Sequence, residues 1–211
     1  MNIETIKTIW ADGELKQNTH IIIDNDGCII VDAGCPLEQV RSVCDLPIKA
    51  VLLTHGHFDH IQYVEDYDKL DVPIYASSEI MDFLTDIDKN VSYWHNPETY
   101  SIDNLITLKD NQEIIFDKHK VKCYHTPGHS IDSVCYLVDD RFLFSGDTVF
   151  SVAVGRTDLP TGDKDTLIQS LNRLLDLDYV ELYTGHGRTS NREEQMTNIP
   201  KWIERLKEMN I

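Results

Sequence analysis

Four side chains of the kinds that bind transition metals lie within a stretch of six residues. The stretch reads His55-Gly56-His57-Phe58-Asp59-His60. Imidazole nitrogens and carboxylate oxygens suit zinc and related divalent metals. The spacing lets His55 and His57 point the same way, and Asp59 and His60 can then turn toward a second metal. So many ligands in so short a stretch are untypical of a polar surface loop, and we predict a metal site here.

Three later segments show the same arrangement with fewer ligands. Each places one ligand-type residue beside glycine, just after a short apolar run that is predicted to be a strand. The segments are residues 124–130 with His129, residues 144–148 with Asp147, and residues 183–187 with His186. None is specific alone, but together with the first stretch they supply enough ligands for two metals that share a bridging ligand.

The apolar pattern indicates which elements hold these residues. An apolar run at residues 50–53 ends just before the first stretch, as expected of a buried strand whose end holds ligands rigidly. Residues 19–24 and 28–32 flank an Asp26-Gly27 turn and are predicted to form a hairpin. A short helix is predicted at residues 36–44.

A second β-rich block follows the polar, mixed residues 77–100, where we predict helix and loop. Its predicted strands are residues 113–116, 121–124, 134–138 and 142–144. A helix capped by Asp163, a strand at residues 180–183 and a last helix with Pro200 near its start complete the chain. Two β-rich blocks, each followed by helices, predict two packed sheets with helices outside them.

Size and composition limit the classes of function. The chain has 211 residues, which suits a single domain over residues 1–211. A formal net charge of −17 repels phosphate groups, so we expect no nucleic-acid or anionic-membrane partner. No signal-like segment and no membrane-span-length apolar stretch is found in the sequence. Five cysteines without CxxC spacing are interpreted as small apolar fillers in a reducing, cytoplasmic setting.

The order of the motifs resembles that of the metallo-β-lactamase superfamily. The family pattern HxHxDH, followed by a later His, Asp and His, is matched by His55, His57, Asp59, His60, His129, Asp147 and His186. Within the superfamily, the segments THGHFDH, HTPGHS, FSGDTVF, GRTDLPTGD and TGHGRTS are most similar to those of short glyoxalase II-like hydrolases. The resemblance implies an α/β fold with four αββα layers and with the metals at one edge of the sandwich.

The resemblance also implies how the ligands divide between two divalent metals. One metal would be bound by His55, His57 and His129, the other by Asp59, His60 and His186, and Asp147 would bridge them. Zinc is the expected metal, with iron and manganese as alternatives. We expect the two ions to lie about 3.5 Å apart, as in other two-metal hydrolytic sites.

Such a site predicts hydrolysis by a metal-bridging hydroxide that attacks an ester or thioester carbonyl. Asp59 is the predicted catalytic residue, because it would bind a metal and also orient the hydroxide by accepting its hydrogen bond. By resemblance, the substrate is expected to be a small hydroxyacyl thioester, as in hydroxyacylglutathione hydrolases. The resemblance leaves open which thiol carries the acyl group.

Other residues receive weaker predictions. Arg156 lies in a segment that resembles the substrate-contacting loop of glyoxalase II and is predicted to hold a substrate carboxylate, with a surface ion pair as the alternative. Asp32 is predicted either to support a ligand histidine or to stabilise a turn. Gln62 and Tyr63 stand where the family usually has small residues and are expected to narrow or reshape the pocket. The histidines interpreted as ordinary polar or packing residues are His20, His95, His119 and His125.

Three other functions remain open at the level of the sequence. Persulfide dioxygenases resemble this chain too, but they bind a single iron with two histidines and an aspartate. Lactonase or phosphodiesterase chemistry would use the same two-metal site. A non-enzymatic metal-binding protein is disfavoured, because the chain supplies ligands for two ions rather than for one closed structural site.

Overall fold

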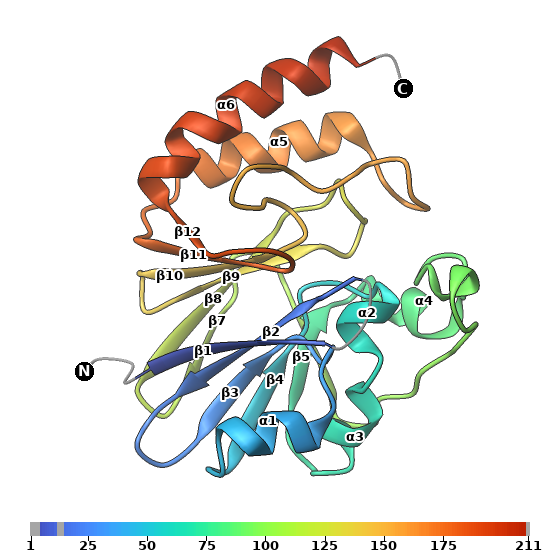
Figure 1. The fold of residues 1–211 in the computed structure, drawn as a ribbon, viewed down its shortest axis with the longest axis vertical. Helices are drawn as coiled ribbons and strands as arrows, with labels where there is room; N and C mark the ends of the chain where they lie inside the picture. The colour runs from blue at the N-terminus through green and yellow to red at the C-terminus, as the bar shows by residue number, and fades with distance from the viewer. Residues whose placement is uncertain (1–4, 12–14, 210–211) are drawn as a thin grey trace.

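Two β-sheets pack face to face in the centre of the protein, and helices cover the outer face of each (Figure 1). The computed structural model describes residues 5–11 and 15–209. The first sheet contains, in spatial order, Thr5–Trp10 (β1), Asn18–Ile23 (β2), Cys28–Val31 (β3), Ile48–Leu52 (β4), Ile74–Ser77 (β5) and Leu105–Leu108 (β6). The second contains Ser190–Asn191 (β12), Glu181–Thr184 (β11), Phe142–Gly146 (β10), Val134–Val138 (β9), His119–His125 (β8) and Glu113–Phe116 (β7).

The helices form the two outer layers. Those that follow strands of the first sheet are Leu37–Val43 (α1), Phe58–Ile61 (α2), Val64–Asp68 (α3), Ile80–Thr85 (α4) and the 3-10 helix Ser92–Trp94 (η1). Lys164–Leu175 (α5) and Arg192–Glu208 (α6) lie side by side over the second sheet (Figure 1). This arrangement confirms the predicted αββα sandwich.

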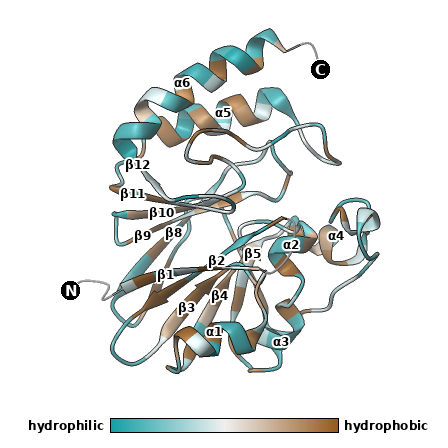
Figure 2. Ribbon diagram, in the orientation of Figure 1, coloured by the Kyte–Doolittle hydropathy of each residue, from teal (hydrophilic) through white to brown (hydrophobic). Residues whose placement is uncertain are grey.

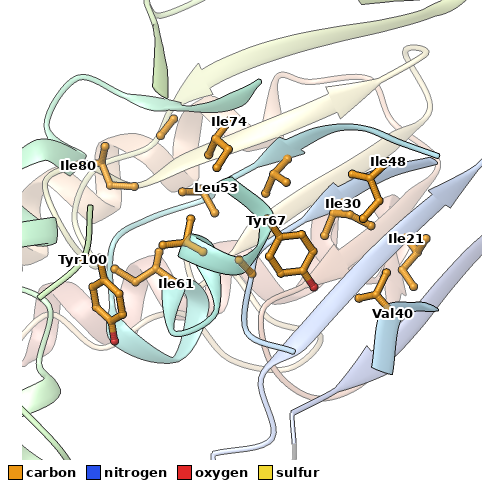
Figure 3. Close-up of a cluster of buried hydrophobic side chains, with 14 of the residues drawn as sticks. Ile21, Ile30, Val40, Ile48, Leu53, Ile61, Tyr67, Ile74, Ile80 and Tyr100 are labelled. Carbon is orange, nitrogen blue, oxygen red and sulfur yellow. The ribbon is translucent and has the colours of Figure 1, made fainter. Parts of the chain in front are cut away.

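The central strands β2, β3 and β4 of the first sheet are buried on both faces, and neighbouring residues enter different cores. Ile21 and Ile30 face the helices, in the cluster drawn in Figure 3. Ile22 and Ile29 face the second sheet instead. Because successive side chains of a strand point to opposite faces, a strand buried on both sides reads as a continuous apolar run. Figure 2 shows the result as apolar strands between helices that are partly polar.

A third cluster joins the second sheet to its helices. Leu167, Leu171 and Leu174 of α5 pack there with Ile199 and Ile203 of α6. The side chain of Asp163 accepts a hydrogen bond of 2.7 Å from the backbone N–H of Thr166, so the predicted cap of α5 is present.

The last helix differs from the prediction. Pro200 was expected near its start, but α6 begins at Arg192 and contains Pro200 in its interior. The side chain of Asn191 caps the helix by accepting a hydrogen bond from the backbone N–H of Glu194.

The strands that the sequence pattern did not predict are β1, β5, β6 and β12. Three of them, β1, β6 and β12, lie at sheet edges, where half-exposed residues lack the apolar run of a central strand, and β5 has only four residues. The five cysteines are buried and none is in a disulfide, in agreement with their interpretation as fillers. Across the described ranges, no helix has both the length and the apolar character needed to cross a membrane.

Candidate metal centre

The predicted ligands follow four strands that end at one edge of the sandwich. The loop after β4 carries His55 and His57, and the helix α2 that follows it carries Asp59 and His60. The loops after β8, β10 and β11 carry the remaining ligands. The structure thereby brings together the whole predicted set, namely His55, His57, Asp59, His60, His129, Asp147 and His186.

Three buried histidines form the first group of ligand atoms. Nδ1 of His57 lies 3.1 Å from Nε2 of His55 and 3.0 Å from Nε2 of His129. The carbonyl oxygen of Arg156 lies 2.8 Å from Nδ1 of His129 and can only accept, so this ring carries its proton on Nδ1. Nε2 of His129 therefore faces the group as a free lone pair, which is the orientation that a metal ligand requires.

Asp59, His60 and His186 form the second group. Oδ2 of Asp59 lies 3.2 Å from Nε2 of His186 and 3.8 Å from Nε2 of His60. The carbonyl of Leu15 accepts a hydrogen bond of 2.9 Å from Nδ1 of His186. As at His129, an acceptor behind the ring leaves Nε2 facing the centre.

Asp147 lies between the two groups. Its Oδ1 is 3.4 Å from Nε2 of His60, and its Oδ2 is 3.4 Å from Nε2 of His186 and 3.7 Å from Nε2 of His129. Gly185 makes room for this carboxylate, since a Cβ atom there would lie 2.0 Å from Oδ1. The position is the one that the predicted bridging role requires.

Burial and charge set the protonation of these side chains. Burial lowers the pKa of His55, His57 and His129, so these rings are neutral at pH 7. Burial alone would raise the pKa of Asp147, but the charges of His186 and His60 outweigh it and hold that pKa well below its usual range. Neutral imidazole and ionised carboxylate are the forms that bind metal.

The same carboxylates act in the opposite direction on two histidines. Burial lowers the pKa of His60, but the carboxylates of Asp32, Asp147 and Asp59 together hold it well above its ordinary value. Burial also lowers the pKa of His186, whereas Asp147 and Asp59 raise it to about 10. Protons on these two rings therefore balance the buried negative charge, and a divalent cation would replace them.

The residues fit a divalent metal. Nε2 of His60 and Oδ1 of Asp147 are buried without a hydrogen-bond partner in the described part of the chain. Such atoms are costly to bury unless something satisfies them. Both face the centre of a set of nitrogen and oxygen donors, which is the chemistry that zinc, iron and manganese accept.

Asp32 supports this centre from behind. Its Oδ2 accepts a hydrogen bond of 2.8 Å from Nδ1 of His60, and its Oδ1 accepts one of 2.8 Å from the backbone N–H of Thr54. The side chain is buried, and its backbone is left-handed with φ at 64°. Of the two roles predicted for Asp32, the structure shows the contact expected of a partner to a ligand histidine.

Asp132 is a supporting residue that the sequence reasoning missed. Its Oδ2 accepts a hydrogen bond of 2.6 Å from the backbone N–H of Gly56, and its Oδ1 accepts one of 2.6 Å from Ser130. Burial raises the pKa of Asp132 to about 7. It fixes the turn between His55 and His57. The available signal was an acidic residue three positions after the predicted ligand His129.

A cavity of about 330 Å³ opens over the metal ligands. Besides those ligands, its described lining consists of Leu15, Phe58, Val91, Trp94, His95, Phe150, Val154, Arg156 and Leu159. His95 was interpreted as an ordinary polar residue, but it lines this cavity and packs on Phe58, with ring centroids 5.0 Å apart. No local pattern indicates this position, because the loop that carries His95 is distant in sequence from every metal motif.

Two expectations about neighbouring residues are not met. Gln62 and Tyr63 are absent from the described lining of the cavity. The side chain of Gln62 donates to the carbonyl of Gly34, and Tyr63 packs against the core beneath α2 and α3. The turn after α2 directs both side chains away from the cavity, so they do not narrow it.

The remaining histidines behave as expected of polar residues. Nε2 of His125 lies 3.0 Å from the carbonyl oxygen of Leu108, and Nε2 of His20 lies 3.0 Å from that of Thr184. His119 lies between the carboxylates of Asp24 and Asp139. None of the three belongs to a cluster of potential metal ligands in the described residues.

Arg156 lies beside the candidate site and also forms an ion pair, so both of the environments considered for it are present. It lines the cavity, with its guanidinium 6.0 Å from the ring of Trp94. The same guanidinium donates two hydrogen bonds of 2.6 Å, one to each carboxylate oxygen of Asp158. Its predicted role in holding a substrate carboxylate stays a prediction, and Asp158 occupies two of its five N–H donors.

Known proteins resemble this chain over most of its length. A probable metallo-hydrolase of Bacillus subtilis, YqgX, is 33% identical over 183 residues, which cover 83% of this chain and 87% of that protein. The hydroxyacylglutathione hydrolase GloC of Haemophilus influenzae is 31% identical, covering 94% of this chain and 97% of GloC.

Solved structures agree with the sequence comparison. The crystal structure of the B3 metallo-β-lactamase BLEG-1 superposes with a TM-score of 0.83 at 30% identity, covering 94% of this chain and 99% of that chain. The sequence pattern of the metallo-β-lactamase superfamily matches residues 12–186, a range that includes every ligand described above. The chain is therefore a member of the metallo-β-lactamase superfamily and a metal-dependent hydrolase.

Proposed function

We propose that this protein hydrolyses a hydroxyacyl thioester at a site that binds two divalent metal ions, zinc first among them. The observation that carries the two-metal site is the position of Asp147, whose carboxylate lies 3.4 Å from His60 and His186 of the second group and 3.7 Å from His129 of the first. The choice of a thioester rests on the likeness to GloC along almost the whole chain. The predicted division of the ligands matches two of the donor clusters in the structure.

The metals, when bound, would polarise the substrate carbonyl and make a water molecule acidic enough to ionise near neutral pH. The other tasks fall to the side chains of the protein. Asp59 is ionised and buried at the floor of the cavity, where its carboxylate accepts a hydrogen bond from the attacking water and orients it. The charges of His60 and His186 keep the pKa of Asp59 low against the effect of burial.

The leaving group of a thioester needs little assistance from the protein. A thiolate is stable near neutral pH, so its departure requires no strong general acid. The cavity instead has to hold the carbonyl over the metal ligands, because a misplacement of about 1 Å costs roughly a hundredfold in rate. A small-molecule partner fits a cavity of about 330 Å³, and the net charge of −17 disfavours nucleic acid.

The test is a hydrolase screen on protein loaded with zinc, iron or manganese. Thioesters, lactones and phosphodiesters are compared at equal concentration, and oxygen uptake is followed with a persulfide. We expect the largest kcat/KM on a thioester and no oxygen consumption. Oxygen uptake by protein that retains one iron per chain would replace the proposal with persulfide dioxygenase activity. Faster turnover of a lactone or a phosphodiester would reject the thioester while retaining the metal site.

A matched variant shows whether the activity belongs to this site. Asp59→Asn keeps the size of the side chain and removes its charge, so thioester turnover should fall on the order of a hundredfold. Asp178→Asn makes the same change at a fully exposed residue and serves as the control. Equal activity in the two variants would remove Asp59 from the mechanism.

A further inference from the structure

The wall of the cavity differs from its floor. The floor consists of the metal ligands, whereas the wall is predominantly apolar. Its apolar residues in the described chain are Leu15, Phe58, Val91, Trp94, Phe150, Val154 and Leu159. Such a wall favours an apolar group on the substrate, because it replaces the water around that group without offering hydrogen bonds in return.

The loop that carries Trp94 is held in a fixed conformation. The backbone carbonyl of Asn90 accepts a hydrogen bond of 2.8 Å from the N–H of Phe58, which ties the loop to the metal motif. The buried side chain of Asn90 donates to the carbonyl of Glu98 and accepts from the N–H of Ser92, both at 2.9 Å. Val91 adopts a φ of 60°, a strained conformation for a β-branched residue. A loop secured in this way can position an aromatic side chain for recognition.

Trp94 lies at the open side of this loop. Its side chain is 56% exposed, although it lines the cavity, and it stands near the guanidinium of Arg156. An exposed indole at the mouth of an apolar cavity is available to a ligand. The wall thus continues from the buried Val91 to the rim.

The only arginine or lysine in the described lining is neutralised by its neighbour. Arg156 donates to both oxygens of Asp158 at 2.6 Å, in the paired geometry that makes arginine–carboxylate contacts strong. A substrate carboxylate would meet a guanidinium whose charge is already balanced by Asp158 and whose Nε–H is occupied, so the attraction for it is weakened. It would also lose its hydration against an apolar wall, and both effects act against an anionic substrate.

We propose that the Arg156–Asp158 pair and the wall around Trp94 make this hydrolase selective for thioesters that are uncharged on both the acyl and the thiol side. The proposal rests on the proposed function for the reaction itself. It replaces the idea of Arg156 as a carboxylate anchor with a role in which Asp158 keeps the wall free of net positive charge.

Three thioesters of similar size test this selectivity. S-butyryl-N-acetylcysteamine is neutral, S-succinyl-N-acetylcysteamine carries a carboxylate on the acyl side, and S-butyryl-3-mercaptopropionate carries one on the thiol side. We expect the neutral compound to have a kcat/KM at least about tenfold above each charged compound, since burying an unpaired charge is costly. A charged compound that equals or exceeds the neutral one in the wild-type protein would overturn the proposal.

Asp158→Asn releases the guanidinium of Arg156 and should reduce the preference for the neutral compound by roughly tenfold. Glu181→Gln is the matched control, because Glu181 pairs with the exposed Arg141 at the far end of β10 and the change in net charge is the same. An unchanged preference in Asp158→Asn, or an equal change in both variants, would contradict the role of the pair.

A binding measurement separates this inference from the proposed reaction. The same three compounds are made as amides, in which nitrogen replaces sulfur and hydrolysis is slow. They are titrated against Trp10→Phe/Trp202→Phe protein, in which Trp94 is the only one of the three tryptophans left. Tighter binding of the neutral amide supports the inference even if no thioester is turned over, and tighter binding of a charged amide overturns it even if thioesters are hydrolysed.

Discussion

The floor and the wall of the cavity are held in place by different means. The floor is formed by residues that directly follow strands of the two sheets, and its histidines are oriented by acceptors such as Asp32 behind their rings. Most of the wall comes from residues 90–98 and 150–159, which join helices and strands, and Leu15 and Phe58 complete it. Strand ends of a packed sandwich are rigid, whereas loops tolerate changes in sequence. We infer that the floor supplies the chemistry of the family and that the wall supplies what is specific to this chain.

The largest expected effect is at the residue that connects both groups of ligands. Asp147→Asn keeps the shape of the side chain but removes the charge that faces His60, His129 and His186. We expect thioester turnover to fall at least about a thousandfold, since the loss removes much of the electrostatic stabilisation of the transition state. Activity assays with metal analysis measure it, and circular dichroism checks that the fold persists. Near-normal turnover and metal content would show that Asp147 does not bridge.

A smaller effect is expected one layer behind the ligands. Asp32→Asn weakens the hydrogen bond to His60 and should lower metal affinity roughly 10- to 100-fold, as measured by competition with a chelator. Asp139→Asn is a close control, because Asp139 also lies 2.8 Å from Nδ1 of a histidine, His119, and also has a positive φ. Equal losses of affinity in both variants would mean that the contact behind His60 has no special role.

Substitutions in the wall should change substrate preference and leave the metals in place. Trp94→Ala removes the exposed indole at the rim, and we expect kcat/KM for the neutral thioester to fall about tenfold with unchanged metal content. Trp10→Ala is the control, since Trp10 has the same 56% exposure and is absent from the described lining. Loss of metal from the Trp94 variant would refute the division between floor and wall.

The pH dependence of stability should differ between metal-free and metal-loaded protein. In metal-free protein, His186 has a folded pKa of about 10, raised above its ordinary value of 6.5. The proton on His186 stabilises the fold fully below pH 6.5, and this contribution is lost as the pH rises toward 10. Bound metal replaces the proton. The Tm of metal-free protein should therefore fall relative to loaded protein, on the order of 5 °C between pH 6.5 and 9.

Thermal unfolding of both forms across this pH range makes the measurement. The variant His186→Gln lacks the titrating ring, so the Tm of its metal-free form should fall less steeply as the pH rises. A constant difference in Tm between the loaded and metal-free forms, at every pH, would show that the His186 proton and the metal do not exchange.

The sequence predicted the floor much better than the wall, for a physical reason. Each ligand follows a buried strand, and apolar runs are readable because strands such as β4 bury both faces. Trp94 and His95 approach the floor only through the tertiary contacts of their loop, for which no local pattern exists. The error at Pro200 has a related origin, since the helix around it is held by the tertiary packing of Ile199 and Ile203, which the proline alone does not reveal.

The central claim is that two metal ions share the carboxylate of Asp147. Elemental analysis of protein reconstituted with excess zinc, iron or manganese and then freed of unbound metal tests this claim most directly. We expect two ions per chain in the wild-type protein and fewer in Asp147→Asn. One ion per chain in the wild-type protein with each metal, and no change in Asp147→Asn, would contradict it.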